Sequence, residues 1–168
     1  ADDFVLGVVG TLAEARDIKT QLAQFLRDEL KLELSPEKTL VTHARSEVAH
    51  FLGYELHTLQ ANDYHDARGQ RCINGQLGFR VPRSVIHKHR SKYMRQGKPI
   101  HLMQRVNDSL YSIVSQYQTE LRGIVQYYRP AYNVHQLYHL KRVMEQSLAK
   151  TIAKKLKITR ARVYKRFK

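Results

Sequence analysis

Residues 1–14 read ADDFVLGVVGTLAE, and this stretch indicates a strand followed directly by a helix. Phe4–Val9 is almost entirely apolar and ends at Gly10, a pattern typical of a buried strand. Thr11 and Glu14 have the spacing of a capping box, which marks the start of a helix. That helix is expected to pack one apolar face on a sheet. Because two carboxylates precede the strand without any leader pattern, the chain is expected to begin inside a domain.

Turn residues and short apolar runs predict further strands after this helix. Asn74-Gly75 is a two-residue hairpin signal between the runs Arg71–Ile73 and Gln76–Val81. Together these patterns predict an α+β fold for residues 1–81, with short antiparallel strands and one long helix. The other expected strands are Leu32–Leu34, Thr39–Thr42 and Val48–Leu59, the last of them broken at Gly53.

Charge is distributed unevenly along the chain. The net charge is +14, yet residues 1–60 contain 6 Lys and Arg against 10 Asp and Glu. Residues 61–168 contain 23 Lys and Arg against 5 Asp and Glu. After Pro82 the apolar residues recur at helical spacing, which predicts an all-helical, basic second part over residues 82–168. The helices expected there are Arg83–Arg95, Asp108–Tyr128, Val134–Lys155 and Thr159–Arg166.

Composition excludes several classes of protein and favours a polyanionic partner. The single cysteine, Cys72, rules out an internal disulfide framework, and it is expected to be a small core residue. No apolar run is long enough to span a membrane. An acidic membrane surface would also attract the basic part, but interleaved His and Tyr residues favour nucleic acid. His135 and His139 have a spacing used by zinc sites, but zinc is not expected without a Glu between them or a Cys nearby.

Asp2 and Asp3 suggest phosphoryl-transfer chemistry. Adjacent carboxylates on a turn beside a strand offer the oxygen ligands that Mg²⁺ prefers. In two-metal phosphoryl transfer, such ligands hold ions that stabilise the attacking and leaving oxygens together. An isolated Asp-Asp pair is weak evidence, because most such pairs are solvated turn residues. The motifs that follow make the interpretation more specific.

The order of these motifs resembles the second half of a group II intron-encoded reverse transcriptase/maturase. ADDF resembles the end of the YADD active-site box, and LSPEKT (34–39) and FLGY (51–54) resemble the palm motifs that follow it. LRGIVQYYRPAYN (121–133) and SLAKTIAKKLKI (147–158) resemble the thumb, or maturase X, region. The resemblance covers essentially the whole chain. It implies the C-terminal part of a reverse-transcriptase palm, followed by an all-helical thumb/maturase domain.

The resemblance implies roles for residues of the palm-like part. Asp2 and Asp3 would be catalytic, metal-binding carboxylates for two Mg²⁺ ions, together with a third Asp from an earlier strand that this sequence does not contain. Lys38 would act near the phosphates of the incoming nucleotide. The primer grip would be formed by Phe51, Leu52, Gly53 and Tyr54, some of which would also be core residues.

In the thumb-like part, the resemblance and the charge pattern both point to RNA. Gly123 within a helix indicates close approach by another helix or by RNA. Asn133 is expected to cap the next helix, and at least half of the four tyrosines between residues 127 and 138 are expected in the core. The residues predicted to bind RNA are Arg122, Tyr127, Tyr128, Lys150, Lys154, Lys155, Lys157, Arg160, Arg162, Lys165 and Arg166.

The implied parent protein is an RNA-directed DNA polymerase that also binds its intron RNA and assists splicing. Its partners would be group II intron RNA, an RNA template, a DNA primer and deoxynucleoside triphosphates, in a bacterial cytoplasm or an organellar matrix. A second interpretation is that the chain is a non-catalytic RNA-binding module. A third is the polymerase of another retroelement, of the retron or diversity-generating type. Because part of the palm would be absent, exposed apolar surface is expected in the first part.

Overall fold

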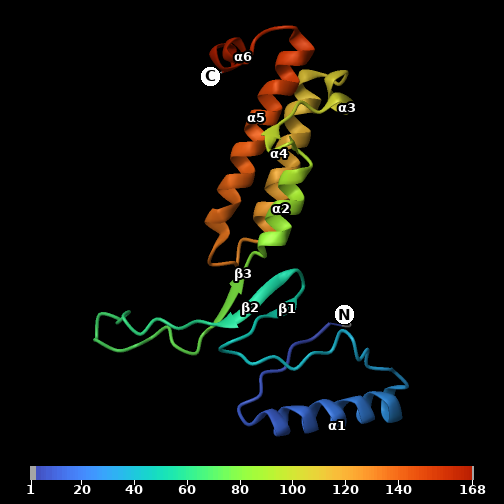
Figure 1. Cartoon of the computed structure of the whole chain (residues 1–168), viewed down its shortest axis with the longest axis vertical. Helices are drawn as coiled ribbons and strands as arrows, with labels where there is room; N and C mark the ends of the chain where they lie inside the picture. The colour runs from blue at the N-terminus through green and yellow to red at the C-terminus, as the bar shows by residue number, and fades with distance from the viewer. Residues whose placement is uncertain (1–2, 168) are drawn as a thin grey trace. The chain divides into compact units, whose positions relative to one another are not determined.

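The computed structural model describes residues 3–167, and the chain divides into two compact units (Figure 1). The first unit ends at Gly78 and the second begins at Phe79, whereas the sequence had suggested a boundary after Val81. The structure combines helices with small antiparallel sheets, so the predicted α+β class is confirmed.

The first unit contains one long helix, α1 (Leu12–Leu30), which begins at the predicted capping box. The Glu14 backbone N–H donates to Thr11 Oγ1 at 3.3 Å, and the Thr11 N–H donates to Glu14 Oε2 at 2.6 Å. The helix ends at Lys31, which has a left-handed φ of 55°. No residue of α1 is buried, and Phe25 is 54% exposed. The expectation that α1 packs a face on a sheet is therefore wrong for the described part of the chain.

Three of the expected strands are irregular in the structure. Phe4–Val9, Leu32–Leu34 and Thr39–Thr42 belong to neither of the two sheets found in residues 3–167. Leu6 is 59% exposed and Leu40 is 71% exposed, so these segments are not buried either. A strand satisfies its N–H and C=O groups through a neighbouring strand. Because these apolar segments have no such neighbour, they form no sheet on which α1 could pack.

A three-stranded sheet, in the order β1-β2-β3, follows the irregular segments. β1 (Ala49–Phe51) and β2 (Tyr54–Thr58) pair antiparallel, and β3 (Leu77–Arg80) lies on the other side of β2. The predicted break at Gly53 is a two-residue turn, in which Leu52 has φ 47° and Gly53 has φ 73°. Positive φ at both central residues is the requirement of a type I′ hairpin turn.

The predicted hairpin at Asn74-Gly75 is wrong, because β3 pairs with β2 and Arg71–Ile73 is not a strand. The dipeptide still forms a turn, and Gly75 has φ 85°. The Gly75 N–H donates to the Leu59 carbonyl at 3.0 Å, which ties the turn to the end of β2. Turn chemistry thus identifies a reversal but not the strand that pairs after it. Cys72, expected in the core, is exposed beside this turn.

The second unit contains the four helices that the sequence predicted, with shifted ends, and two short additional turns. No helix in the described part of the chain is both long and apolar enough to cross a membrane. The main helices are α2 (Arg83–Ser91), α4 (Leu110–Tyr127), α5 (Leu137–Leu156) and α6 (Arg160–Arg166); the short ones are α3 (Met103–Val106) and the 3₁₀ turn η1 (Val134–Gln136).

A small hairpin interrupts the first of the predicted helices. α2 ends at Ser91, and β4 (Met94–Arg95) then pairs antiparallel with β5 (Lys98–Pro99). The turn between them, Gln96-Gly97, has φ values of 49° and 73°, again as a type I′ turn requires. The helical spacing before residue 95 therefore did not reveal that the chain reverses here.

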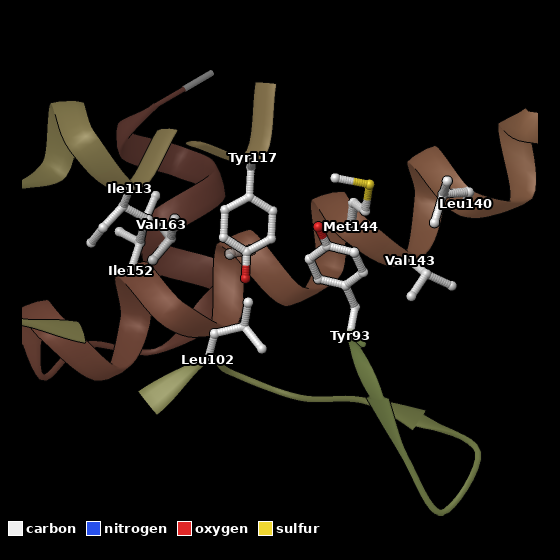
Figure 2. Close-up of a cluster of buried hydrophobic side chains, with 10 residues drawn as sticks. Tyr93, Leu102, Ile113, Tyr117, Leu140, Val143, Met144, Ile152 and Val163 are labelled. Atoms are coloured by element: carbon white, nitrogen blue, oxygen red, sulfur yellow. The ribbon is translucent and has the colours of Figure 1, made fainter. Parts of the chain in front are cut away.

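The core of the second unit lies where α4, α5 and α6 meet the segment around the hairpin (Figure 2). Figure 2 shows Tyr93 at the base of the hairpin and Tyr117 on α4 pointing into the same cluster. Their ring centroids are 5.5 Å apart. The buried cluster consists of Tyr93, Leu102, Ile113, Tyr117, Leu140, Val143, Met144, Ala149, Ile152 and Val163.

Buried hydroxyl groups connect α4, α5 and the chain that follows the hairpin. The Tyr117 hydroxyl lies 2.8 Å from Ser147 Oγ and 3.2 Å from Thr151 Oγ1. Ser147 Oγ donates to the Ile100 carbonyl at 2.5 Å, and the Leu102 N–H donates to Thr151 Oγ1 at 3.0 Å. These polar groups are satisfied inside the core, which buried polar groups require.

Asn133 is buried and stands at the predicted N-cap position, in front of η1, but its side chain makes no capping hydrogen bond there. Its Oδ1 accepts from the Val81 N–H at 2.8 Å, and its Nδ2 donates to the Val81 carbonyl at 3.2 Å. The adjacent Tyr132 N–H donates to the Phe79 carbonyl at 3.0 Å. The turn between α4 and α5 is therefore bound to the chain that enters α2. The backbone groups that make this connection are the N–H and C=O of Val81 and the C=O of Phe79.

We expect Asn133→Ala to destabilise the second unit by about 3 kcal/mol, because the Val81 N–H and C=O would be buried without partners. Urea unfolding followed by circular dichroism measures the change. Asn107→Ala, at an exposed position, is the matched control and should change the free energy of unfolding by less than about 0.5 kcal/mol. Equal effects of the two substitutions would contradict the prediction.

Thr151→Val keeps the side-chain shape but removes the oxygen that accepts from the Leu102 N–H. We expect a loss of about 2 kcal/mol in the free energy of unfolding, since that N–H is buried with the segment. Thr119→Val, on the exposed side of α4, is the control and should be nearly neutral. Thermal unfolding curves of both variants test this, and an unchanged Thr151→Val midpoint would disprove it.

Candidate nucleic-acid interface

Two of the three residues predicted to carry polymerase chemistry lie in the described part of the chain, and both are exposed. Asp2 lies outside the described residues, Asp3 is exposed in the irregular segment before α1, and Lys38 is exposed in the turn after Ser35. Within residues 3–167, no three His, Cys, Asp or Glu side chains are placed so that they could hold a metal ion. The Mg²⁺ site that the family resemblance implied, with Asp2, Asp3 and a third Asp from outside this sequence, stays a prediction.

The FLGY sequence forms the turn between β1 and β2. Phe51 and Tyr54 face each other in the strand register, and both side chains are half-buried. Leu52 and Gly53 form the exposed tip. Leu52 is 54% exposed and has a left-handed φ. The four residues thus divide into a pair that belongs to the sheet and a pair at the exposed tip of the turn. Contact of that tip with a primer stays a prediction.

The four tyrosines between residues 127 and 138, which run from the end of α4 to the start of α5, lie mostly on the surface. Tyr128 is only 6% exposed and belongs to the core, so its prediction as an RNA contact is wrong. The Tyr127 ring packs edge-on against it, with centroids 4.9 Å apart, and remains 53% exposed. Tyr132 and Tyr138 are 50% and 62% exposed. The expectation that at least half of these tyrosines are core residues is therefore also wrong.

Arg122 and Gly123 lie on the exposed surface of α4. A methyl group added at Gly123 would meet no atom within 4 Å, so no other helix approaches this glycine closely. The explanation by close helix packing is therefore wrong. Alanine at this position would stabilise the helix by up to about 1 kcal/mol relative to glycine. Helix packing does not explain why glycine is found here. Approach by RNA, the other explanation, stays a prediction.

Two lysines predicted to bind RNA also form hydrogen bonds to the chain around α5. Lys150 Nζ donates to the Pro99 carbonyl at 2.6 Å, and Lys155 Nζ donates to the Val106 carbonyl at 3.2 Å. Both side chains are half-buried. Their positive charges remain near the surface, but their hydrogen-bonding capacity is partly used within the protein.

The rest of the C-terminal basic segment is exposed. α5 ends at Lys157, which has a left-handed φ of 52°, and Thr159 caps α6 by accepting from the Arg162 N–H at 3.4 Å. Val163 is buried and fixes α6 against the core. The exposed cations of this segment, termed here the basic end, are Lys154, Lys157, Arg160, Arg162, Lys165 and Arg166.

All three acidic side chains of the second unit are engaged by neighbours. Asp108 accepts from Gln116 Nε2 at 3.0 Å, and Glu145 pairs with Lys141 at 3.7 Å. Glu120 binds both the Arg105 guanidinium and the Tyr93 hydroxyl. Burial, and then the bond to Glu120, raise the pKa of the Tyr93 phenol above its usual value. The negative charge of this unit is thus largely compensated locally, and most of its cations face solvent.

Sequence reasoning missed a second group of cations on α2 and the hairpin. Arg83, Lys88, Lys92, Arg95 and Lys98 are all exposed. Burial, followed by the charges of Lys92 and Lys88, lowers the pKa of the His89 imidazole below its usual value. The signal was present in the sequence, because no acidic residue occurs between Asp66 and Asp108.

The sequence of the basic second unit matches a known protein family. The sequence model of the type II intron maturase family matches residues 75–168. The group II intron-encoded protein LtrA of Lactococcus lactis subsp. cremoris is 34% identical over 178 residues, which cover 100% of this chain and 30% of that protein. The putative COX1/OXI3 intron 2 and intron 1 proteins of Saccharomyces cerevisiae are 26% and 28% identical, covering 94% and 99% of this chain and 20% and 22% of their own lengths. The chain belongs to the type II intron maturase family.

Proposed function

We propose that this chain is the part of a group II intron-encoded reverse transcriptase/maturase that binds the intron RNA and assists its splicing. The observation that carries the proposal is the charge arrangement of the second unit. Its acidic side chains are paired within the protein, while the cations of the basic end are exposed. Such a surface attracts a polyanion and releases counterions when phosphates are bound.

Splicing assistance requires binding to a folded RNA but no chemical step by the protein. A rigid helical unit with outward cations suits this task, because backbone contacts position an RNA without reading its sequence. Arg122 and the exposed Tyr127 on α4 would add contacts to the same RNA, the tyrosine by stacking on an unpaired base.

The parent protein is proposed to be an RNA-directed DNA polymerase, acting on an RNA template, a DNA primer and deoxynucleoside triphosphates. In that protein Asp2 and Asp3 would hold two Mg²⁺ ions with a third carboxylate, Lys38 would lie near the nucleotide phosphates, and FLGY would support the primer end. This part of the proposal rests on the motif resemblance and on the relationship to intron-encoded proteins. Such catalysis depends on positioning and on neutralising charge.

A second candidate is a non-catalytic RNA-binding module with no polymerase role. Two observations favour it for this chain: the exposed position of Asp3 and the absence of a metal-binding cluster in residues 3–167. Both candidates share the RNA surface of the second unit, and polymerase activity separates them.

We expect replacement of Arg160, Arg162, Lys165 and Arg166 by Gln to weaken binding of a folded group II intron RNA by about tenfold or more. The logarithm of the association constant falls by about 0.7–0.9 per phosphate contact for each decade of salt. Loss of up to four contacts should therefore reduce that slope by roughly 3. Fluorescence anisotropy across a salt series measures both quantities.

The matched control is replacement of Arg16, Arg27, Lys31 and Arg45 by Gln, which removes the same charge from exposed positions of the first unit. It should leave RNA affinity nearly unchanged. An unrelated structured RNA of equal length is the second control. Preference for the intron RNA at moderate salt supports the maturase proposal, whereas equal binding of both RNAs, lost steeply with salt, would contradict it.

We expect the 168-residue chain to give no primer extension on a primed RNA template with Mg²⁺ and deoxynucleotides, because its described carboxylates form no metal cluster. Asp3→Asn should leave intron RNA affinity unchanged, since this carboxylate lies in the first unit. Extension by the chain that Asp3→Asn abolishes would contradict this prediction and restore a catalytic role to the chain alone.

A further inference from the structure

The β4–β5 hairpin and the outer surface of α2 form a second cationic surface, which neither the family match nor the sequence prediction assigned to RNA. Its exposed cations are Arg95 and Lys98 on the hairpin and Lys88 and Lys92, which are four residues apart and share one face, on and just after α2. Glu120 is the carboxylate whose charge acts on His89 of α2. Its side chain is bound by Arg105 and Tyr93. The positive potential of this surface is therefore not balanced by a free carboxylate among the described neighbours.

The register of the hairpin places its two cations on one side. Met94 is opposite Pro99, and Arg95 is opposite Lys98. Side chains alternate between the two faces of a strand pair, so Arg95 and Lys98 share the face opposite to Met94. Met94 packs against the buried cluster, which means that the cationic face is directed away from the core.

The base of the hairpin is fixed, so its tip is presented rigidly. The Ile100 N–H donates to the Tyr93 carbonyl at 2.9 Å, and Tyr93 is only 3% exposed. Lys150 Nζ holds the Pro99 carbonyl from α5, and Ser147 Oγ holds the Ile100 carbonyl. Figure 2 shows the hairpin loop extending away from the cluster that anchors Tyr93.

Two features of the tip are unfavourable for the isolated protein. Like charges directly opposite in a strand pair are destabilising, and Arg95 and Lys98 are such a pair. Gln96 also adopts a left-handed φ of 49°, which is unfavourable for a residue with a side chain. An anion bound between the two cations would remove the first penalty. The hairpin is thus built so that a phosphate stabilises it.

We propose that the β4–β5 hairpin is a phosphate-binding finger for RNA, with Arg95 and Lys98 on either side of one backbone phosphate and the outer face of α2 following the same strand. This inference rests on the proposed RNA-binding function and adds a contact surface apart from the basic end. RNA is the partner that fits, because several exposed cations along a helix and a hairpin match a repeating polyanion. Lys150 of α5 contacts the Pro99 carbonyl at the base of the finger.

The test uses the double variant Arg95→Gln/Lys98→Gln and the charge-reversal variant Arg95→Glu in the full chain. The double variant should bind a folded group II intron RNA about five- to tenfold more weakly, with a salt slope reduced by roughly 1–2. An unrelated structured RNA should lose affinity by the same factor, because phosphate contacts carry no sequence information.

Thermal unfolding separates this role from a structural one. Neither variant should melt at a lower temperature, and Arg95→Glu should melt at the same or a higher temperature, because it places opposite charges across the strand pair. The combination of a more stable protein and weaker RNA binding is the expected signature. Arg16→Gln/Arg27→Gln, which removes two exposed cations from α1, is the matched control and should bind as the wild type does.

Wild-type affinity and salt slope in both hairpin variants would overturn this inference alone, leaving the proposed function intact. A lower melting temperature that accounts for the lost RNA binding would also overturn it, because the cations would then act on stability. If the unaltered chain binds neither RNA, the proposed function fails and the phosphate-binding finger fails with it.

Discussion

The hydroxyl groups of Tyr117, Ser147 and Thr151, buried between α4 and α5, determine how the second unit is assembled. They bond to one another and to the backbone at Ile100 and Leu102, so the chain that leaves the hairpin is fixed against two helices at once. Directional bonds inside an apolar cluster select one arrangement, because any shift would leave a buried polar group unsatisfied. The positions of the hairpin and of α5 follow from this selection.

That arrangement also determines which charged side chains remain exposed on the second unit. Glu120 is bound at the edge of the core by Arg105 and Tyr93, and Arg105 lies over the Tyr117 ring at 4.6 Å from its centroid. Lys150 and Lys155 bind carbonyl groups of the chain around α5. Most of the remaining cations, including those of the basic end, are exposed to solvent. Core packing and the exposed cationic surface proposed to bind RNA are therefore consequences of the same side-chain pairing.

The two units differ in how far they satisfy their own apolar residues. The second unit, from Phe79, nearly coincides with the family match at residues 75–168 and encloses a continuous core. In the first unit α1 has no buried residue, and Phe4, Leu6 and Leu40 are more than half exposed. The expected exposure of apolar surface in the first part is thus confirmed for the described residues. Capping chemistry starts a helix locally, but burial of its apolar face needs partners from elsewhere.

Local patterns determined the helices, the capping box at Thr11, the turn at Gly53 and the basic character of the second part, because each depends on neighbouring residues. Motif order further indicated the family. Tertiary structure alone decided strand pairing, the burial of Tyr128, the pairing of Asn133 with Val81 and the use of Lys150 to hold the hairpin. These outcomes depend on which distant groups meet, as the 52-residue separation of Asn133 and Val81 illustrates. The spacing of residues along the chain does not specify these long-range contacts, because a turn, a lysine or an amide is equally compatible with several partners.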